Sequence, residues 1–128
     1  MSLRMLIVDD DVVVRLSVRN IIATNRPEWQ ICGEAEDGAK AVAKVLELTP
    51  DAVILDLAMP VMNGIEAAKQ IRRLAPSTKI VLFSAHDVPA FVWEGCADAF
   101  VSKLSIGDEL AAVIEQLTRP AVRTAKKS

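Results

Sequence analysis

Residues 3–16 read LRMLIVDDDVVVRL, and this stretch decides how the rest of the sequence is interpreted. Residues 3–8 are almost continuously apolar and too few for a typical helix, so they predict a buried strand. Three aspartates at 9–11 follow that strand directly. Residues 12–24 then predict a helix that stops before Pro27. The apolar positions that give this segment its helical spacing are Val13, Leu16, Ile21 and Ile22.

The same succession of strand and helix recurs four more times along the chain. Five such units with mostly apolar strands predict an α/β fold, in which a parallel sheet is covered by helices on both faces. The crossovers are expected to be right-handed, and reactive groups to gather at the carboxyl ends of the strands. The further strands are predicted at 29–33, 52–56, 79–84 and 99–101, and the helices at 39–48, 65–74, 88–94 and 107–118.

The composition is typical of one acidic domain and argues against several classes of protein. The chain has 128 residues, and its 52% hydrophobic content is enough for a sizeable core. A net charge of −2 argues against an obligate nucleic-acid binder, which usually carries a basic surplus. No apolar run approaches the roughly 18 residues of a membrane span, and no signal-peptide pattern is present. Two cysteines cannot form a disulfide framework, so we expect a cytoplasmic location.

The charge is distributed unevenly between the body of the chain and its end. Residues 1–118 carry a net charge of −6, whereas residues 119–128 contain four basic residues and no acid. We therefore expect one domain over 1–118, followed over 119–128 by a basic tail or the start of a linker.

Polar side chains stand at the ends of four predicted strands. The aspartates at 9–11 follow the first strand, Asp56 ends the third, Ser84 ends the fourth, and Lys103 follows the fifth. In a parallel sheet all of them gather at one edge. There, two carboxylates repel each other by about 4 kcal/mol at roughly 4 Å when the effective dielectric constant is near 20. Something must offset this repulsion.

A bound cation is the expected counter-charge. Mg²⁺ prefers oxygen ligands, and one or two carboxylates suffice to hold it. Lys103 adds a second positive charge, and Ser84 adds a hydroxyl donor. A cation, a lysine and a hydroxyl around one carboxylate make a phosphoryl-binding site. The central carboxylate would be the nucleophile and would form an acyl phosphate.

The polar residues at the strand ends, with the segment DLAMPVMNG at 56–64, resemble a known family. They look like the receiver domain of two-component response regulators, most of all the regulators that carry a helix-turn-helix domain. The resemblance covers residues 3–118. It implies a flavodoxin-like, doubly wound (βα)5 fold with strand order 2-1-3-4-5. The residues that carry it are Asp9, Asp10, Asp56, Ser84 and Lys103.

The resemblance also implies a chemistry. Asp56 is the phosphoacceptor, and it takes a phosphoryl group from a sensor histidine kinase or a phosphotransfer protein. The cofactor is Mg²⁺ or Mn²⁺. Asp10, Asp56 and the backbone carbonyl of Ala58 would bind the cation, and Asp9 would act partly through water. The domain would catalyse only its own phosphorylation and dephosphorylation.

Further residues have roles that come from the resemblance alone. Ser84 would bond the phosphoryl group after it arrives, and Lys103 would pair with it. Phe100 stands at the family's aromatic switch position. Phosphorylation would change the surface made by the fourth helix, fifth strand and fifth helix. That surface would control an output such as transcription, or would bind a partner or a second copy.

The residue after Lys103 departs from the family pattern. Many members have a proline there in a cis peptide, whereas this chain has Leu104. A lysine without the proline is common among regulators with a C-terminal helix-turn-helix domain. We therefore interpret 119–128 as the start of a linker to an output domain, through which alone DNA would be contacted. The alternative is a stand-alone regulator that acts by protein contact.

A phosphatase of the haloacid-dehalogenase type is a further alternative. Such enzymes use an aspartate nucleophile after the first strand and a second aspartate two residues later, an outline that Asp9 and Asp11 fit. Ser84 and Lys103 would complete it. The chain has no convincing final acidic pair and no cap domain, and Asp56 would have no role, so the receiver is favoured.

Several other residues have simpler interpretations. Asp11 is expected to cap the helix that follows it, and Gly64 to serve the backbone geometry at a helix start. His86, the only histidine, either tunes the hydrolysis of the phosphoryl group or lies exposed in a loop. Cys32 and Cys96 are expected to be small buried apolar residues.

Overall fold

The computed structural model describes residues 2–103 and 107–119, and its strands and helices alternate along the chain. The elements are β1 (Arg4–Val8), α1 (Val12–Asn25), β2 (Gln30–Ala35), α2 (Gly38–Leu48), β3 (Ala52–Asp56), α3 (Gly64–Leu74), β4 (Lys79–Ser84), α4 (Ala90–Trp93), β5 (Ala99–Ser102) and α5 (Gly107–Thr118). Every neighbouring pair of strands is parallel, and the sheet order is β2-β1-β3-β4-β5. The predicted flavodoxin-like fold and strand order are confirmed.

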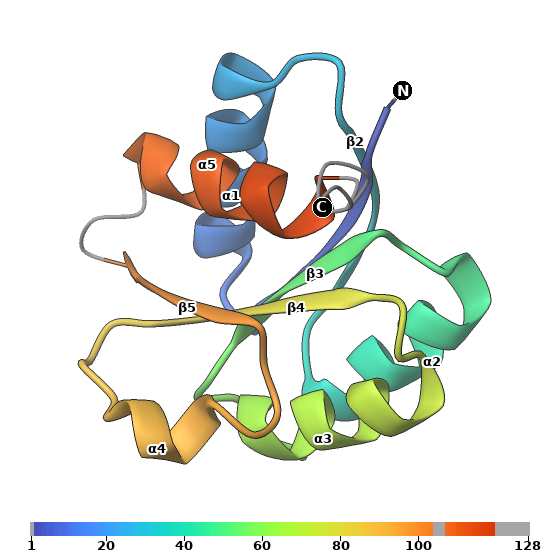
Figure 1. The fold of residues 1–128 in the computed structure, drawn as a ribbon, viewed down its shortest axis with the longest axis vertical. Coiled ribbons are helices and arrows are strands. Elements are labelled where there is room, and N and C mark those ends of the chain that lie inside the picture. Colours follow the sequence, from blue (N-terminus) through green and yellow to red (C-terminus); the bar gives the residue numbers. More distant parts are fainter. Residues whose placement is uncertain (1, 104–106, 120–128) are drawn as a thin grey trace, which may run out of the picture.

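The helices form two layers on opposite faces of the sheet. α1 and α5 lie on one face, and α2, α3 and α4 lie on the other (Figure 1). One apolar cluster, which includes Leu55 and Ile71, fills the space under α2 and α3. A second cluster, which includes Ile7 and Ile22, fills the space under α1 and α5. The central strands are buried on both faces, which explains their nearly continuous apolar runs.

Side-chain caps fix the starts of α1, α2 and α3. The carboxylate of Asp11 accepts a hydrogen bond from the backbone N–H of Val13 at 2.9 Å, which confirms the expected cap of α1. Asp37 and Asn63 cap α2 and α3 in the same way. Because the caps define where α1 and α3 begin, they also fix the ends of the loops that follow β1 and β3.

The apolar positions that gave α1 its helical spacing do not all face the sheet. Val13 and Leu16 are 64% and 54% exposed, whereas Val18 and Ile22 are buried against the sheet. These two residues lie four apart, as expected of neighbours on one helix face. α1 contains more apolar residues than one face can bury, so several sets of positions satisfy the same spacing. The spacing alone does not identify the set that faces the sheet.

Two other elements differ in extent from their predicted ranges. β2 covers residues 30–35 instead of 29–33, because an edge strand tolerates polar residues and its apolar run understates its length. The pairing of β2 with β1 is irregular around Cys32. Cys32 is only partly buried, contrary to expectation, whereas Cys96 is buried as expected. α4 is a single turn, shorter than the predicted 88–94, and begins after Pro89. The remaining elements agree with prediction to within one residue at each end.

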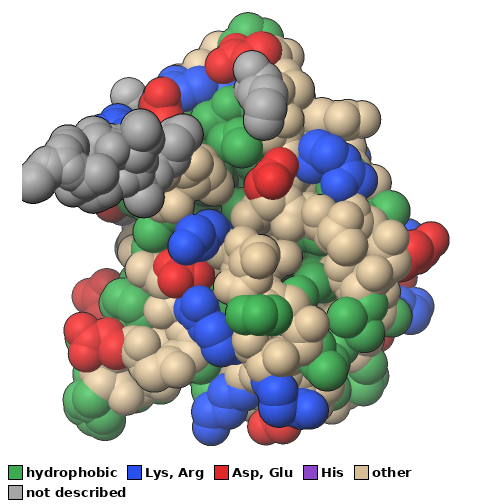
Figure 2. All heavy atoms as spheres, turned by 45° about the vertical axis from the view of Figure 1, so that its right-hand side comes forward, with side chains coloured by type: hydrophobic (Ala, Val, Ile, Leu, Met, Phe, Trp, Pro, Cys, Tyr) green, Lys and Arg blue, Asp and Glu red, His purple; other side chains and the backbone are tan. Residues whose placement is uncertain are grey.

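Opposite charges are mixed on the surface. Basic and acidic side chains both occur on the face drawn in Figure 2, with apolar side chains between them. Exposed ion pairs such as Lys40 with Glu36, at 3.3 Å, contribute roughly 0–1 kcal/mol each. In residues 2–103 and 107–119 no helix is long and apolar enough to cross a membrane. Leu104 and nearly all of the predicted tail at 119–128 lie outside the described residues.

Candidate functional site

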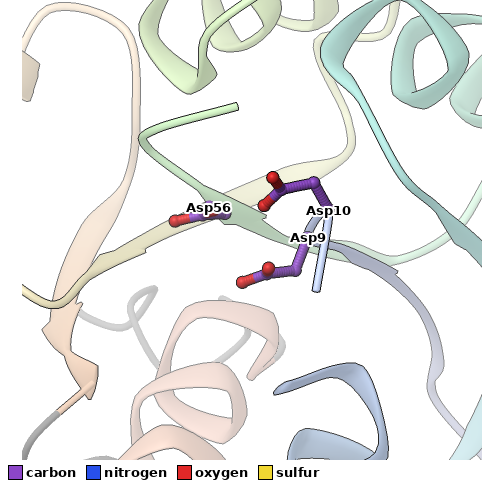
Figure 3. A group of neighbouring side chains, drawn as sticks. All are labelled: Asp9, Asp10 and Asp56. Carbon is purple, nitrogen blue, oxygen red and sulfur yellow. The ribbon is translucent and has the colours of Figure 1, made fainter. Parts of the chain in front are cut away.

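The carboxyl ends of β1, β3, β4 and β5 meet at one edge of the sheet and carry the predicted polar residues. Asp9 directly follows β1, Asp56 is the last residue of β3, Ser84 is the last of β4, and Lys103 follows β5. Figure 3 shows the carboxylates of Asp9, Asp10 and Asp56 side by side. One oxygen from each lies within 4.8 Å of the others. The structure thus brings together three carboxylates that the sequence separates.

The three carboxylates differ in their access to solvent. Asp9 and Asp56 are 1% and 4% exposed, whereas Asp10 is exposed. Burial of a carboxylate without a compensating partner is costly, so the two inner groups need positive charge. The exposed Asp10 makes the group accessible from outside, and a cation bound there could keep some of its waters.

Lys103 supplies part of the positive charge. Its Nζ lies 2.9 Å from Oδ2 of Asp9 and 3.1 Å from Oδ1 of Asp56, so one ammonium links the two buried carboxylates. The same Nζ lies 4.8 Å from the centre of the Phe83 ring, a cation–π distance. The ring and the carboxylates together fix the lysine head group at the centre of the site.

The balance of burial and charge shifts the pKa of two of these groups. Burial raises the pKa of the Asp56 carboxyl and Asp9 raises it further, while Lys103 and the backbone N–H of Ala58 oppose the shift only in part. Burial alone would lower the pKa of the Lys103 ammonium. Its hydrogen bonds and charge interactions with Asp9 and Asp56 outweigh that effect, so its pKa is raised. One lysine does not neutralise the three carboxylates, which leaves a net negative site.

The raised pKa of Asp56 predicts that its charge destabilises the fold when no divalent cation is bound. Between the ordinary value of 3.8 and the raised folded value, the folded state binds more protons than the unfolded state. The stabilising contribution of Asp56 is therefore at its maximum below pH 3.8. It is lost as the pH rises through the pKa that Asp56 has in the folded state. Urea unfolding with EDTA should show Asp56→Asn becoming more stable than the parent chain as pH rises through this window. A stability difference that does not change with pH would contradict the prediction.

The sequence of this chain is similar to that of a known domain family. Residues 5–115 match the family model of the response regulator receiver domain. The chain belongs to the response regulator receiver family. It is a receiver domain of two-component response regulators, and receiver domains bind Mg²⁺ at an acidic pocket.

Individual relatives of this receiver include both chemotaxis proteins and transcriptional regulators. The chemotaxis protein CheY of Thermotoga maritima is 43% identical over 94 residues, which are 73% of this chain and 77% of that protein. The transcriptional regulatory protein YxjL of Bacillus subtilis is 33% identical over 92% of this chain and 55% of its own length. The crystal structure of a LuxR-family regulator from Aurantimonas sp. matches with a TM-score of 0.84 and 35% identity, covering 92% of this chain and 86% of that one.

The phosphatase alternative loses one of its required residues in this receiver. Asp11, the second aspartate of that outline, uses its carboxylate to cap α1. Its backbone N–H donates to Oδ1 of Asp9 at 2.8 Å, so it serves the loop between β1 and α1. Asp56, which the phosphatase would leave without a role, lies instead at the centre of the receiver's site.

Ser84 lies at the site edge, but its hydroxyl is directed to the following loop. The residue is 4% exposed, and its Oγ accepts a hydrogen bond from the backbone N–H of His86 at 3.1 Å. His86 is exposed in the loop between β4 and α4, as one of the two interpretations expected. This contact uses the hydroxyl oxygen as an acceptor, and the hydroxyl hydrogen of Ser84 takes no part in it. Its role and that of His86 stay predictions.

Phe100 of β5 is held by a second aromatic ring. Its ring stacks on that of Trp93 with centroids 6.1 Å apart and planes 20° apart. Phe100 is partly buried, and both rings pack on the cluster under α2 and α3. The switch role of Phe100 stays a prediction, but any change of its side-chain rotamer would disturb this stack.

The loop from β3 to α3 is packed closely against the end of β3. A Cβ atom on Gly64 would lie 2.3 Å from the backbone oxygen of Asp56 and 2.8 Å from Cα of Leu57. The N–H of Gly64 donates to the carbonyl of Leu57 at 2.7 Å. Gly64 therefore serves a close backbone approach, as expected, and it supports the turn that carries Ala58. The predicted metal-ligand role of the Ala58 carbonyl stays untested.

Two contacts of the site were missed by reasoning from sequence. Phe83 lies under the Lys103 head group, and Arg15 of α1 donates to the backbone carbonyl of Asp9. Phe83 gave no signal, because a phenylalanine in an apolar strand is expected in any core. Arg15 gave none either, because the sequence does not show which groups its guanidinium reaches.

Proposed function

We propose that this receiver accepts a phosphoryl group on Asp56 and uses the acyl phosphate as a signal. The observation that carries the proposal is the contact of one lysine with two buried carboxylates, beside a third that is exposed. Such a site is short of positive charge until a cation binds. It could hold the dense negative charge of a phosphoryl group only with both Lys103 and a cation present.

The chain's own residues have distinct parts in the transfer. A carboxylate oxygen of Asp56 attacks phosphorus, while the bond from phosphorus to the donor's leaving atom breaks and its electron pair leaves with that atom. The leaving group takes its proton from solvent. Lys103 then pairs with a phosphoryl oxygen, and Ser84 donates its hydroxyl hydrogen to another. Burial of Asp56 removes competing water from the nucleophile.

The donor set of the site fits Mg²⁺ or Mn²⁺. The clustered side chains offer only carboxylate oxygens, which hard cations prefer. Asp10, Asp56 and the carbonyl of Ala58 would hold the ion, with Asp9 acting partly through water. The bound ion would neutralise charge on the transferring phosphoryl group. These residues need no rearrangement of the strands, because all of them stand at the ends of β1 and β3.

The test of the phosphoacceptor is covalent labelling by a small phosphodonor such as acetyl phosphate. Mass spectrometry of the intact chain should show the gain of one phosphoryl group with Mg²⁺ and none with EDTA. Cleavage of the acyl phosphate by hydroxylamine should reverse the gain. A chain that gains no phosphoryl group at saturating donor and Mg²⁺ would contradict the proposal.

The donor in the cell is proposed to be a sensor histidine kinase or a phosphotransfer protein in the cytoplasm. The exposed apolar face of α1 supports a protein donor, because its residues follow directly after the acidic loop. Val12, Val13 and Leu16 are 56%, 64% and 54% exposed. Apolar side chains gathered beside a reactive site are typical of a docking surface.

The docking proposal predicts that Leu16→Glu slows transfer from a phosphohistidine protein about tenfold, because it puts a charge into an apolar contact. Labelling by acetyl phosphate, which needs no docking, should keep its rate. The matched control is Leu46→Glu on α2, since Leu46 is 51% exposed and belongs to another helix. Equal rates for both variants with the protein donor would refute this use of α1.

The output is proposed to follow from a change of the surface formed by α4, β5 and α5. Movement of Ser84 toward the phosphoryl group and of Phe100 inward would disturb the stack on Trp93 and so reposition α4. Control of transcription through a further domain is supported by the regulators among the relatives, with a stand-alone regulator as the alternative. Size-exclusion chromatography with and without beryllofluoride would test for a phosphorylation-dependent homodimer.

A further inference from the structure

Arg15, the last residue of the first turn of α1, reaches back to the strand end that carries the aspartates. Its Nη1 donates a hydrogen bond to the backbone carbonyl of Asp9. Its Nε donates to Oε1 of Glu34 on β2 at 2.8 Å, and the side chain of Arg15 is only 16% exposed. One guanidinium therefore ties the loop after β1 to the neighbouring strand.

Two electrostatic effects of opposite sign act on Arg15. A cation in the first turn opposes the helix dipole at a cost of about 0.3–1 kcal/mol. Glu34 offsets this cost, and it also accepts hydrogen bonds from Arg19. The hydrogen bonds from Arg19 and Arg15 lower the pKa of the Glu34 carboxyl, so Glu34 stays charged.

The hydrogen bond from Arg15 to the carbonyl of Asp9 constrains the backbone next to Asp10. The carbonyl of Asp9 belongs to the peptide that leads into Asp10. Within residues 2–103 and 107–119, the Asp10 carboxylate makes no hydrogen bond or ion pair, whereas Asp9 is held by Lys103 and by the N–H of Asp11. The position of the Asp10 carboxylate therefore depends on its backbone. A fixed carbonyl at Asp9 limits rotation of the connecting peptide.

We propose that Arg15, held in place by Glu34, is a positioning residue that fixes the Asp9–Asp10 peptide and so presents the Asp10 carboxylate to a divalent cation. This inference rests on the cation site of the proposed function. Arg15 itself does not touch the cation or the phosphoryl group in this role. It acts through the backbone of the two aspartates.

If Arg15 acted only through its charge, its removal would change the affinity for the cation in the direction opposite to that expected from a loss of positioning. Removal of a positive charge from the neighbourhood of three carboxylates should strengthen cation binding. Loss of positioning should weaken it, because part of the binding energy must then be used to order Asp10. The direction of the change therefore separates the two explanations.

The experiment is a titration with Mn²⁺, in which the electron paramagnetic resonance signal reports the free ion. Arg15→Ala should raise the Kd for Mn²⁺ about tenfold, since a hydrogen bond of a charged group contributes on this scale. Arg15→Lys keeps the positive charge, but a lysine ammonium lacks the forked donors that contact both Glu34 and the carbonyl of Asp9. The Kd of this variant for Mn²⁺ should therefore lie between those of the parent chain and Arg15→Ala.

Arg19→Ala is the matched control. Arg19 is on the same helix and pairs with the same Glu34, but it has no contact with Asp9. Arg19→Ala also removes one positive charge, so the Kd of this variant for Mn²⁺ should stay unchanged or fall slightly. Urea unfolding gives the free energy of unfolding of each variant. The loss relative to the parent chain should be similar for Arg15→Ala and Arg19→Ala, because each variant loses an ion pair with Glu34.

Several outcomes would overturn the inference. Unchanged or tighter Mn²⁺ binding by Arg15→Ala would leave Arg15 without a positioning role, and equal weakening by Arg19→Ala would assign the effect to the ion pair alone. If Arg15→Ala does not fold, the test uses Arg15→Lys. A Kd of Arg15→Lys for Mn²⁺ equal to that of the parent chain would then overturn the inference. Failure of the parent chain to bind Mn²⁺ would overturn the cation site and the inference together, whereas binding that is insensitive to Arg15 would overturn only the inference.

Discussion

Asp56→Asn should abolish covalent labelling by acetyl phosphate in the presence of Mg²⁺. The amide has nearly the same shape and can still accept a hydrogen bond from Lys103, which lies 3.1 Å from Oδ1 in the parent chain. It is not a nucleophile that can form an acyl phosphate. The expected result is complete loss of the added mass, in a variant that is folded and at least as stable as the parent at neutral pH without a cation.

The control for this variant is Asp51→Asn. Asp51 is an exposed aspartate near the opposite ends of the strands, where it accepts a hydrogen bond from the N–H of Arg4 at 2.8 Å. Its substitution should leave the extent of labelling unchanged. Full labelling of Asp56→Asn would instead place the acceptor elsewhere, and mapping of the modified peptide to Asp9 would revive the phosphatase alternative.

Gly64→Ala should lower the free energy of unfolding by about 1–3 kcal/mol, because a methyl group there has no space. The new Cβ would lie 2.3 Å from the backbone oxygen of Asp56 and 2.8 Å from Cα of Leu57. Both contacts are with backbone atoms, so no flexible side chain can move away. Relief of the clash must shift the loop from β3 to α3, and labelling of Asp56 by acetyl phosphate should slow as well.

Gly95→Ala is the matched control for the glycine variant. A Cβ on Gly95 would meet nothing within 4 Å, and its backbone φ is not positive. Its substitution should change the free energy of unfolding by no more than about 0.5–1 kcal/mol, with a gain expected from the lower entropy of the unfolded chain. Urea unfolding measures both variants. Equal stability of Gly64→Ala and the parent would show that the loop can move away without cost.

The sequence was sufficient for the fold because its strongest signals are local. Short apolar strands, the capping Asp11 and the breaks at Pro27 and Pro76 each act over a few residues, and together they determine the order of the elements. Which side of α1 is buried depends on what lies across from it. The helical spacing that includes Val13 and Leu16 therefore does not show that these two residues are exposed while Ile22 is buried.

The candidate site could be predicted in its members but not in its contacts. A parallel sheet places the carboxyl ends of its strands together, so Asp9, Asp56 and Lys103 could be expected at one edge. The partners that hold them could not, because Arg15 reaches the carbonyl of Asp9 from a helix and Phe83 lies under Lys103 through the alternation of β4. Such contacts depend on the side-chain directions of three or more elements at once.

The bond from Lys103 to Asp9 joins residues 94 positions apart in the chain. During synthesis, Asp56 and its neighbouring aspartates leave the ribosome well before the lysine that completes their site. Until Lys103 is added and β5 pairs with β4, the growing chain lacks the ammonium that contacts Asp9 and Asp56 in the folded domain. The internal counter-charge of the acidic site is thus the last part of it to be synthesised.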